Sequence, residues 1–507
     1  MGLNIKVDFA LSLTAVILVL SFQTLQADDA VVLRLKADLD FLCSPELSGR
    51  DVPGETGDKT AEWIANRFDQ LDIEPLFTDG SYLQEVPLIS GIVDTQNTVF
   101  MINNKPLKWG NDYYVFPRKL DSLDVELSAA WCSYGLQTAE LGRADFEEAN
   151  GKAALVMSGS GDVPRDLAGR HALTPFKAAS AERAGVKMLL VNYSSSSPTD
   201  WPPGEIANKI SDLDRLIIDL PESKSDIPVI YLNASSVLPI LMIRQDSEPQ
   251  NLDQVKVRLV LKFTRLESHH GFNVAGMIRN TRPGYVVLGA HYDHLGTDPE
   301  TGYYYPGADD NASGIAGLLE ICRELTENRS KDARSIIFTA FTAEEDGLLG
   351  SMWFVNNFPI QKTEIFAMIN MDMIGRRGSG NMRELNSDDT GDSLYVGLFF
   401  SGAAPGLRNV SRSAADLSDL NAEINPVNSF AHFGDAASFH DVQIPTIHIF
   451  SGFHRDYHSL HDTVDRLDFN KMGKIVSLSS QLVTNLSEEA GDLPFDPSIQ
   501  VKGYIPH

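Results

Sequence analysis

One stretch, 312-ASGIAGLLEICRELTENRSKDARSIIFTAFTAEEDGLLG-350, combines the local patterns that decide the fold. Its first part predicts an amphipathic helix, because apolar residues recur at intervals of three and four: Ile315, Leu318, Leu319, Cys322 and Leu325. After a polar turn, the run RSIIFTAF is typical of a buried strand. Two adjacent acids, Glu344 and Glu345, follow this strand, and they raise the question of what the chain uses them for.

The same alternation of strand, turn and helix extends from about residue 270 towards the C-terminus. The other buried runs are GYVVLGA at 284–290, FAMINM at 366–371 and IPTIHIF at 444–450. Strands that alternate with helices imply an α/β fold with a mostly parallel central sheet. We expect helices to cover both faces of this sheet.

The middle of the chain has a different pattern, and 507 residues are too many for one ordinary domain. From about 120 to 265, short β-like runs such as KAALVMSG, VKMLLVNY and IPVIYLN are separated by Ser, Pro and Gly. We therefore expect residues 120–265 to form an inserted β-rich unit. The main domain would then comprise residues 28–119 and 266–507.

The N-terminus has the layout of a signal peptide. A single Lys precedes an apolar run from Phe9 to Phe22, and small Ala27 stands before two acids. The apolar run is shorter than the ~20 residues of a membrane span, although an uncleaved anchor is the alternative. We expect residues 1–27 to be removed and the protein to be secreted, periplasmic or extracellular, with no stable membrane span.

Charge and cysteine content exclude several classes of function. The net charge of −27 argues against binding to nucleic acids, because nothing would offset repulsion from the phosphates. Three widely spaced cysteines, Cys43, Cys132 and Cys322, exclude a disulfide framework and a thiolate metal site.

Acidic and imidazole side chains follow the predicted strands. They are His291, Glu344, Glu345 and Asp372, joined by Asp309 and Asp310 of the turn PGADDNASG and by His458 and His461 of RDYHSLHDT. In open α/β sheets, functional groups collect beyond the carboxyl ends of the strands. Each piece alone could be a turn, a cap or a solvated pair, but together they form a nitrogen and oxygen ligand set that suits zinc.

These stretches resemble the co-catalytic di-zinc aminopeptidases, whose relatives include bacterial leucyl aminopeptidases, glutamate carboxypeptidase II and the transferrin receptor. The matching motifs are GAHYDHLG, PGADDNASGIAGLLE, FTAEEDGLLGS, NMDMIG and DYHSLHDTVDRLDF, in the order of the family. The segment LSGRDVPGETGDKTAEWIANRF resembles the N-terminal part of bacterial members. The runs GKAALVMSG and FKAASAERAGVKMLLVN resemble an inserted protease-associated domain.

The resemblance implies a zinc-exopeptidase-like fold and two Zn²⁺ ions, with Co²⁺ or Mn²⁺ as substitutes. Carried over by position, it makes His291 and Asp372 ligands of one zinc, and Glu345 and His458 ligands of the other. Asp310 would bridge both ions.

The resemblance also implies two catalytic roles besides the ligands. Glu344 would be the free carboxylate that moves the proton, and Asp293 would orient the imidazole of His291. His294 and His461 remain turn residues in this assignment.

The function expected from the resemblance is hydrolysis of peptides by a secreted aminopeptidase. One alternative is a dipeptidase or a glutamate-carboxypeptidase-like exopeptidase, in which Arg376 and Arg377 would clamp an acidic C-terminus instead of forming a solvated pair. Another alternative is a non-catalytic, receptor-like scaffold. Many bacterial relatives carry Ser-Asp-His where this chain has Gly434, Asp435 and Ala436, which leaves the preferred substrate side chain open.

Overall fold

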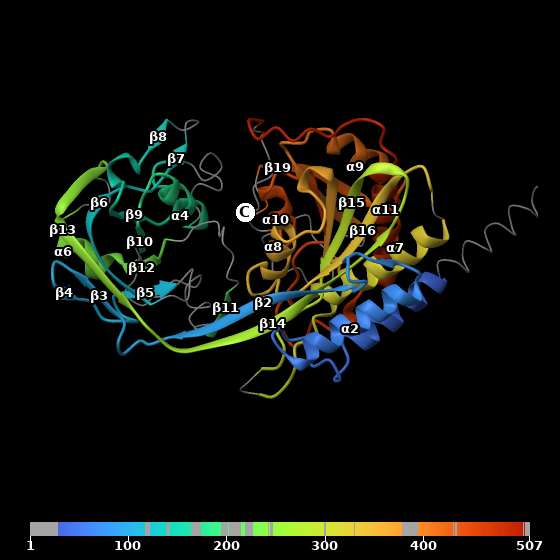
Figure 1. Ribbon diagram of the computed structural model, residues 1–507, viewed down its shortest axis with the longest axis horizontal. Coiled ribbons are helices and arrows are strands. Elements are labelled where there is room, and N and C mark those ends of the chain that lie inside the picture. The colour runs from blue at the N-terminus through green and yellow to red at the C-terminus, as the bar shows by residue number, and fades with distance from the viewer. Residues whose placement is uncertain are drawn as a thin grey trace, which may run out of the picture. The chain divides into compact units, whose positions relative to one another are not determined.

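The computed structural model describes residues 29–116, 122–138, 142–163, 174–193, 201, 214–217, 227–241, 243, 247–298, 301–328, 330–377, 394–428, 430, 433–499 and 501. The chain divides into two compact units, of which unit 1 is Met1–Val86 with Gly271–His507 and unit 2 is Pro87–His270. The chain leaves unit 1 within β2 (Leu83–Val93) and returns within β14 (Phe263–Ile278) (Figure 1). The predicted insert, residues 120–265, falls inside unit 2, which begins earlier and ends a few residues later.

Unit 1 is built on a mixed sheet with strand order β14-β16-β15-β17-β20-β18-β19, and β1 (Glu74–Pro75) pairs with β14. The further strands are β15 (Arg282–His291), β16 (Arg334–Phe341), β17 (Ile365–Asp372), β18 (Tyr395–Ser401), β19 (Asn421–Val427) and β20 (Thr446–Phe450). The central strands β16, β15, β17 and β20 are parallel, whereas β14 and β18 run antiparallel to their neighbours β16 and β20. The predicted α/β fold is confirmed, and the parallel arrangement holds for the strands that carry the site.

Helices cover both faces of this sheet, α7 and α11 on one and α8 and α10 on the other (Figure 1). The helices of unit 1 are a first helix over 29–42, α2 (Glu55–Gln70), α7 (Gly314–Glu327), α8 (Leu349–Asn356), α9 (Leu407–Ala415), α10 (Ala436–Asp441) and α11 (Phe469–Glu488). Phe354 of α8 and Phe439 of α10 join a core with Val287 and Met368. All five apolar positions predicted for α7 are buried, so its amphipathic face is confirmed.

Unit 2 contains an eight-stranded sheet of order β4-β3-β13-β6-β9-β10-β12-β5. Its strands are β3 (Val99–Ile102), β4 (Lys105–Pro106), β5 (Tyr113–Phe116), β6 (Leu123–Trp131), β9 (Ala153–Met157), β10 (Met188–Tyr193), β12 (Val229–Asn233) and β13 (Gln250–Leu261). The three β-like runs predicted from the sequence form β9, β10 and β12, and these strands pair in parallel. Helix α4 (Thr174–Arg183) packs on one face of the sheet and α6 (Ala234–Leu241) on the other.

The N-terminal segment predicted as a signal peptide, residues 1–27, lies outside the described residues. Among the residues that the structure describes, no helix has the length and apolar character needed to cross a membrane. Cys43, Cys132 and Cys322 are buried and free, which agrees with the exclusion of a disulfide framework.

Candidate metal centre

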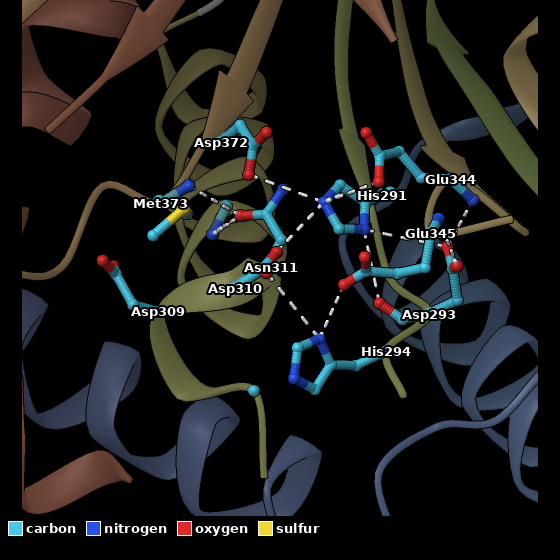
Figure 2. A network of polar contacts seen from close by, with 12 residues as sticks. His291, Asp293, His294, Asp309, Asp310, Asn311, Glu344, Glu345, Asp372 and Met373 are labelled. Carbon is cyan, nitrogen blue, oxygen red and sulfur yellow. Dashed lines mark hydrogen bonds and ion pairs between the residues drawn. The ribbon is translucent and has the colours of Figure 1, made fainter. Parts of the chain in front are cut away.

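The carboxyl ends of the central strands bring the predicted site residues together (Figure 2). His291 is the last residue of β15 and Asp372 the last residue of β17, and Glu344 and Glu345 lie in the turn that follows β16. Because β15 pairs in parallel with both β16 and β17, the three strands end at the same edge of the sheet. The irregular turn η5 (Ala308–Ser313) adds Asp310 and leads directly into α7.

The imidazole of His291 lies among three carboxylates. Its Nε2 atom is 3.5 Å from Asp310 Oδ1, 3.5 Å from Asp372 Oδ1 and 3.9 Å from Glu344 Oε2. Asp372 Oδ1 is buried and has no hydrogen-bond partner among the described residues. A buried carboxylate oxygen without a partner is costly, which is the situation expected of an atom that binds a cation.

The imidazole of His458 occupies a similar position on the other side of Asp310. Its Nε2 atom is 3.1 Å from Asp310 Oδ2 and 3.1 Å from Glu345 Oε2. The ring of Tyr457 stacks on the His458 ring with centroids 3.8 Å apart. Asp310 therefore directs one oxygen to each of two imidazoles, which is the placement required of a carboxylate that bridges two cations.

Candidate ligand atoms group into two clusters among the described residues. Within each cluster the atoms lie within 4.8 Å of one another, and the clusters are His291, Glu344 and Asp372, and His294, Asp310 and Glu345. With His458, all five predicted ligands and the predicted base converge on one place. The donors are imidazole nitrogens and carboxylate oxygens, a set that fits zinc.

The adjacent acids Glu344 and Glu345 have opposite electrostatic environments. Burial raises the pKa of Glu344 well above its usual range, and the carboxylates of Glu345, Asp435 and Asp372 add to this effect. Burial also acts to raise the pKa of Glu345, but hydrogen bonds with His294 and His458 lower it well below the usual range. Neighbouring carboxyl groups with pKa values pushed apart are typical of a division between proton transfer and charge binding.

The two histidines compensate the negative charge of this cluster. Burial alone would lower the pKa of His291, but Glu344, Asp293 and Asp372 raise it well above its usual range. Burial likewise acts against the charged form of His458, whereas the carboxylates of Asp310 and Glu345 raise its pKa to about 11. The cluster thus attracts positive charge strongly, and two divalent cations fit this demand.

Asp293 holds the turn that carries the two acids. Its carboxylate accepts hydrogen bonds from the backbone N–H groups of Glu344 at 3.1 Å and Glu345 at 3.2 Å. His291 Nδ1 lies 3.3 Å from the carbonyl oxygen of Asp293 and 3.7 Å from its carboxylate. Asp293, which was predicted to orient His291, thus lies beside the imidazole and also bonds the Glu344–Glu345 turn.

Comparison with known proteins identifies the part of the chain that carries this centre. The sequence pattern of peptidase family M28 matches residues 273–483, which include all the residues above. Residues 273–483 are therefore similar in sequence to peptidase family M28.

Two related proteins show how far the sequence similarity extends along the chain. Aminopeptidase YwaD of Bacillus subtilis (strain 168) is 28% identical over 304 residues, which are 57% of this chain and 58% of that protein. A probable zinc metalloprotease of Pyrenophora teres f. teres (strain 0-1) is 33% identical over 150 residues, 29% of this chain and 30% of that protein. The chain thus spans less than two thirds of the length of either relative.

The fold is similar to that of a solved structure. The aminopeptidase from Aneurinibacillus sp. strain AM-1 has a TM-score of 0.50 at 16% sequence identity, and the comparison covers 92% of this chain and 96% of that one. At this identity the likeness concerns the fold alone.

One residue of the candidate metal centre has contacts that were not expected from the sequence. His294 was expected to be a turn residue, but its imidazole is buried, and Nδ1 lies 2.8 Å from Glu345 Oε1 and 3.9 Å from Asp310 Oδ2. Its position three residues after His291, within HYDH, was the only available signal. His461, by contrast, is exposed, as expected for a turn residue outside the centre.

The segment with Gly434 and Asp435 borders the candidate metal centre. A Cβ atom at Gly434 would lie 3.1 Å from Glu344 Oε1 and 3.1 Å from Asp372 Oδ2, so this glycine leaves space beside both carboxylates. Asp435 is fully buried, and burial raises its pKa to about 7, with Asp293 and Asp372 adding to the shift. The departure from Ser-Asp-His noted in the sequence therefore occurs in contact with the centre.

Asp309, Arg376 and Arg377 bond residues other than the predicted metal ligands. Asp309 Oδ1 accepts a hydrogen bond from the backbone N–H of Gly375 at 2.6 Å, and Figure 2 shows this side chain apart from His291. Arg376 is buried and donates to Asp456 Oδ2 at 2.8 Å, so it is not the solvated residue that was expected. Arg377 is half-exposed and pairs with Asp468 at 3.0 Å.

Proposed function

We propose that this protein is a metallopeptidase that binds two zinc ions and releases N-terminal residues from peptides. The observation that carries the proposal is the position of Asp310, with one carboxylate oxygen directed to His291 and the other to His458. The family of residues 273–483 and the aminopeptidase and metalloprotease names of the relatives support it.

The proposed ligands follow from this arrangement. His291 and Asp372 would hold one zinc ion, Glu345 and His458 the other, and Asp310 both, while His294 lies beside the second set. When bound, zinc supplies Lewis acidity that polarises a peptide carbonyl group and lowers the pKa of water.

Glu344 is the proposed proton carrier. It lies in the first cluster, its pKa is raised by burial, and the N–H groups of its turn are fixed by Asp293. A carboxyl group with these properties can take a proton from the attacking water and give it to the leaving amine. Glu345, whose pKa is lowered, stays ionised and suits metal binding.

Two observations favour this function over the alternatives. Arg376 pairs with Asp456, and Arg377 pairs with Asp468, so both guanidinium groups have carboxylate partners within the chain. This pairing argues against a clamp for the acidic C-terminus of a substrate. The presence of every predicted ligand together with Glu344 argues against a non-catalytic scaffold.

The proposal extends to the location of the protein and to unit 2. The leader-like pattern of residues 1–27 supports export, and the runs that form β9 and β10 resemble a protease-associated domain. Mass spectrometry of the mature N-terminus tests the first point, since export with cleavage predicts a start near residue 28.

A panel of peptides tests the activity. The full chain, stripped of metal and reloaded with zinc, should release single residues from free N-termini, as mass spectrometry would show, and should leave N-acetylated versions of the same peptides intact. The metal-free protein should be inactive on both. Cleavage of the acetylated peptides at internal bonds would contradict the aminopeptidase proposal, and full activity without metal would contradict a metal mechanism.

A further inference from the structure

The turn that carries Asp310 leaves several of its backbone groups without hydrogen-bond partners inside the turn. Asp310 and Asn311 have non-helical dihedral angles, φ −107° with ψ 96° and φ −128° with ψ 39°, and residues 308–313 are buried. A regular helical ladder is therefore broken at this point, and water does not reach it. Buried peptide groups need hydrogen-bond partners, so other parts of the chain must supply them.

Arg50 supplies donors for the carbonyl groups that lead into this turn. Its guanidinium group donates to the carbonyl oxygens of Pro306 at 2.8 Å and Gly307 at 2.9 Å, and a longer contact of 3.5 Å reaches that of Asp310. It also donates to the carbonyl oxygen of Tyr292 at 2.6 Å, the residue after His291. Arg50 is completely buried, and one guanidinium group thus connects the segments of two proposed ligands.

Asp462 supplies the acceptor for the N–H groups of the same turn. The N–H of Asp309 lies 3.1 Å and 3.0 Å from the two carboxylate oxygens of Asp462, and the N–H of Asp310 donates to Oδ2 at 3.1 Å. The backbone N–H of Ala308 donates to the carbonyl oxygen of Asp462 at 3.0 Å. Asp462 follows His458 in the same loop, so this contact also links the second imidazole to the turn.

The segment around Arg50 fits closely against the loop after β15. Gly49 has φ +81°, and a Cβ atom there would lie 2.4 Å from the carbonyl oxygen of Gly296, so glycine is required. The N–H of Gly296 donates to the Gly49 carbonyl at 3.1 Å, and the N–H of His294 to the Arg50 carbonyl at 3.4 Å. The motif LSGR therefore meets the ligand loops through its backbone and its arginine.

We infer that Arg50 and Asp462 are positioning residues of the metal centre. Arg50 holds the carbonyl groups of Pro306 and Gly307, which lead into the Asp310 turn, and Asp462 holds the N–H groups of the turn itself. The inference rests on the proposed function, because it concerns the same centre. Both side chains act through the backbone. The five planar donors of an arginine reach carbonyl groups on separate segments, whereas the three donors of a lysine share one nitrogen atom. Loss of either contact should let the bridging carboxylate move relative to the two imidazoles.

Three variants of the full chain test this inference: Arg50→Lys, Asp462→Asn and the control Arg67→Lys. Arg67 is a part-buried arginine of α2 that pairs with Asp38 at 3.0 Å, in the same unit. Zinc affinity and stoichiometry are measured by titration calorimetry on metal-free protein, together with kcat, KM and circular dichroism. We expect zinc affinity to fall about 10-fold to 100-fold in the first two variants, with kcat reduced more than KM is raised, and both to be unchanged in the control.

The outcomes separate the positioning role from the proposed function. Variants that lose stability but, when folded, bind zinc and turn over substrate as the wild type does would overturn the positioning role. Where Arg50→Lys does not fold, Asp462→Asn carries the test, because it keeps the size of the side chain and one acceptor oxygen. A wild-type chain that binds no zinc would instead overturn the proposed function.

Discussion

The two units present the same local geometry and use it differently. Unit 1 has four parallel strands, β16, β15, β17 and β20, and unit 2 also has four, β6, β9, β10 and β12. In unit 1 the strand ends carry His291, Asp372 and the acids after β16. In unit 2, the amide of Asn192 near the end of β10 donates instead to the backbone carbonyl oxygen of Val156 at 3.0 Å. A parallel sheet provides the place for a site, and the residues at its strand ends provide the chemistry.

Buried charge differs between the units in the same way. Unit 1 concentrates carboxylates and imidazoles that compensate one another and invite cations. In unit 2, the fully buried Lys177 donates to the carbonyl oxygens of Met157 at 2.8 Å and Gly159 at 2.7 Å. Its amino group therefore holds the loop that follows β9. Each difference between the units can be tested by substitution.

The largest effect is expected from Asp310→Asn. The amide of asparagine has no negative charge with which to bridge two cations, so the variant should lose bound zinc. Its turnover should fall below that of any other variant described below. The matched control is Asp145→Asn in unit 2, where Asp145 is also buried but accepts a hydrogen bond from the N–H of Leu136 at 2.9 Å. Elemental analysis after gel filtration measures the bound zinc. Full zinc content in the Asp310 variant would contradict its bridging role.

The next effect is expected from Glu344→Gln. The amide keeps the size of the side chain and cannot accept the proton, so turnover should fall by roughly 10²-fold to 10⁴-fold. Because Asp310, Glu345 and both imidazoles remain, the zinc content should match that of the wild type. Steady-state kinetics and elemental analysis of the same sample check both points, and a variant with nearly full activity would show that another group moves the proton.

The sequence predicted the parts of the fold and site that depend on local patterns. The apolar spacing of α7 and the buried run of β16 correctly predicted that the Glu344–Glu345 turn follows a buried strand of the sheet. The antiparallel strands β14 and β18 were not predicted, because strand direction depends on the path of the chain between strands. The motifs of the resemblance named residues whose side chains the structure then brings together.

Contacts between distant segments could not be predicted from the sequence. The contact between His294 and Glu345 spans 51 positions, so it leaves no periodic signal in the sequence. Arg50 lies 242 positions from Tyr292 and bonds backbone carbonyl groups, for which no residue type gives a sequence pattern. Such residues are found only when the backbone partners of a buried turn are counted in the structure.

A smaller effect is expected from Gly434→Ala, with Gly159→Ala of unit 2 as its matched control. Both glycines have positive φ, +51° and +76°, so each substitution should cost about 1 kcal/mol of stability. Only at Gly434 would the new methyl group lie 3.1 Å from Glu344 and Asp372, whereas at Gly159 nothing lies within 4 Å. We expect kcat to fall in the Gly434 variant alone, while thermal denaturation shows similar losses in both. Equal kcat in the two variants would mean that Gly434 is not needed beside the carboxylates.

The smallest effect on turnover is expected from Lys177→Met, which should instead change how stability depends on pH. Burial lowers the pKa of Lys177 from 10.5 to about 7. Between these values the unfolded chain binds a proton that the folded chain has released, so stability should rise with pH from about 7 upwards. The two carbonyl acceptors favour the protonated form and so limit this gain in stability, which we expect to be about 2 kcal/mol between pH 7 and 9. The methionine variant should lack this rise.

Urea denaturation at several pH values measures the free energy of unfolding, and hydrogen exchange of β9 and β10 assigns the change to unit 2. An equal dependence on pH in the wild type and the variant would mean that Lys177 keeps its proton throughout this range.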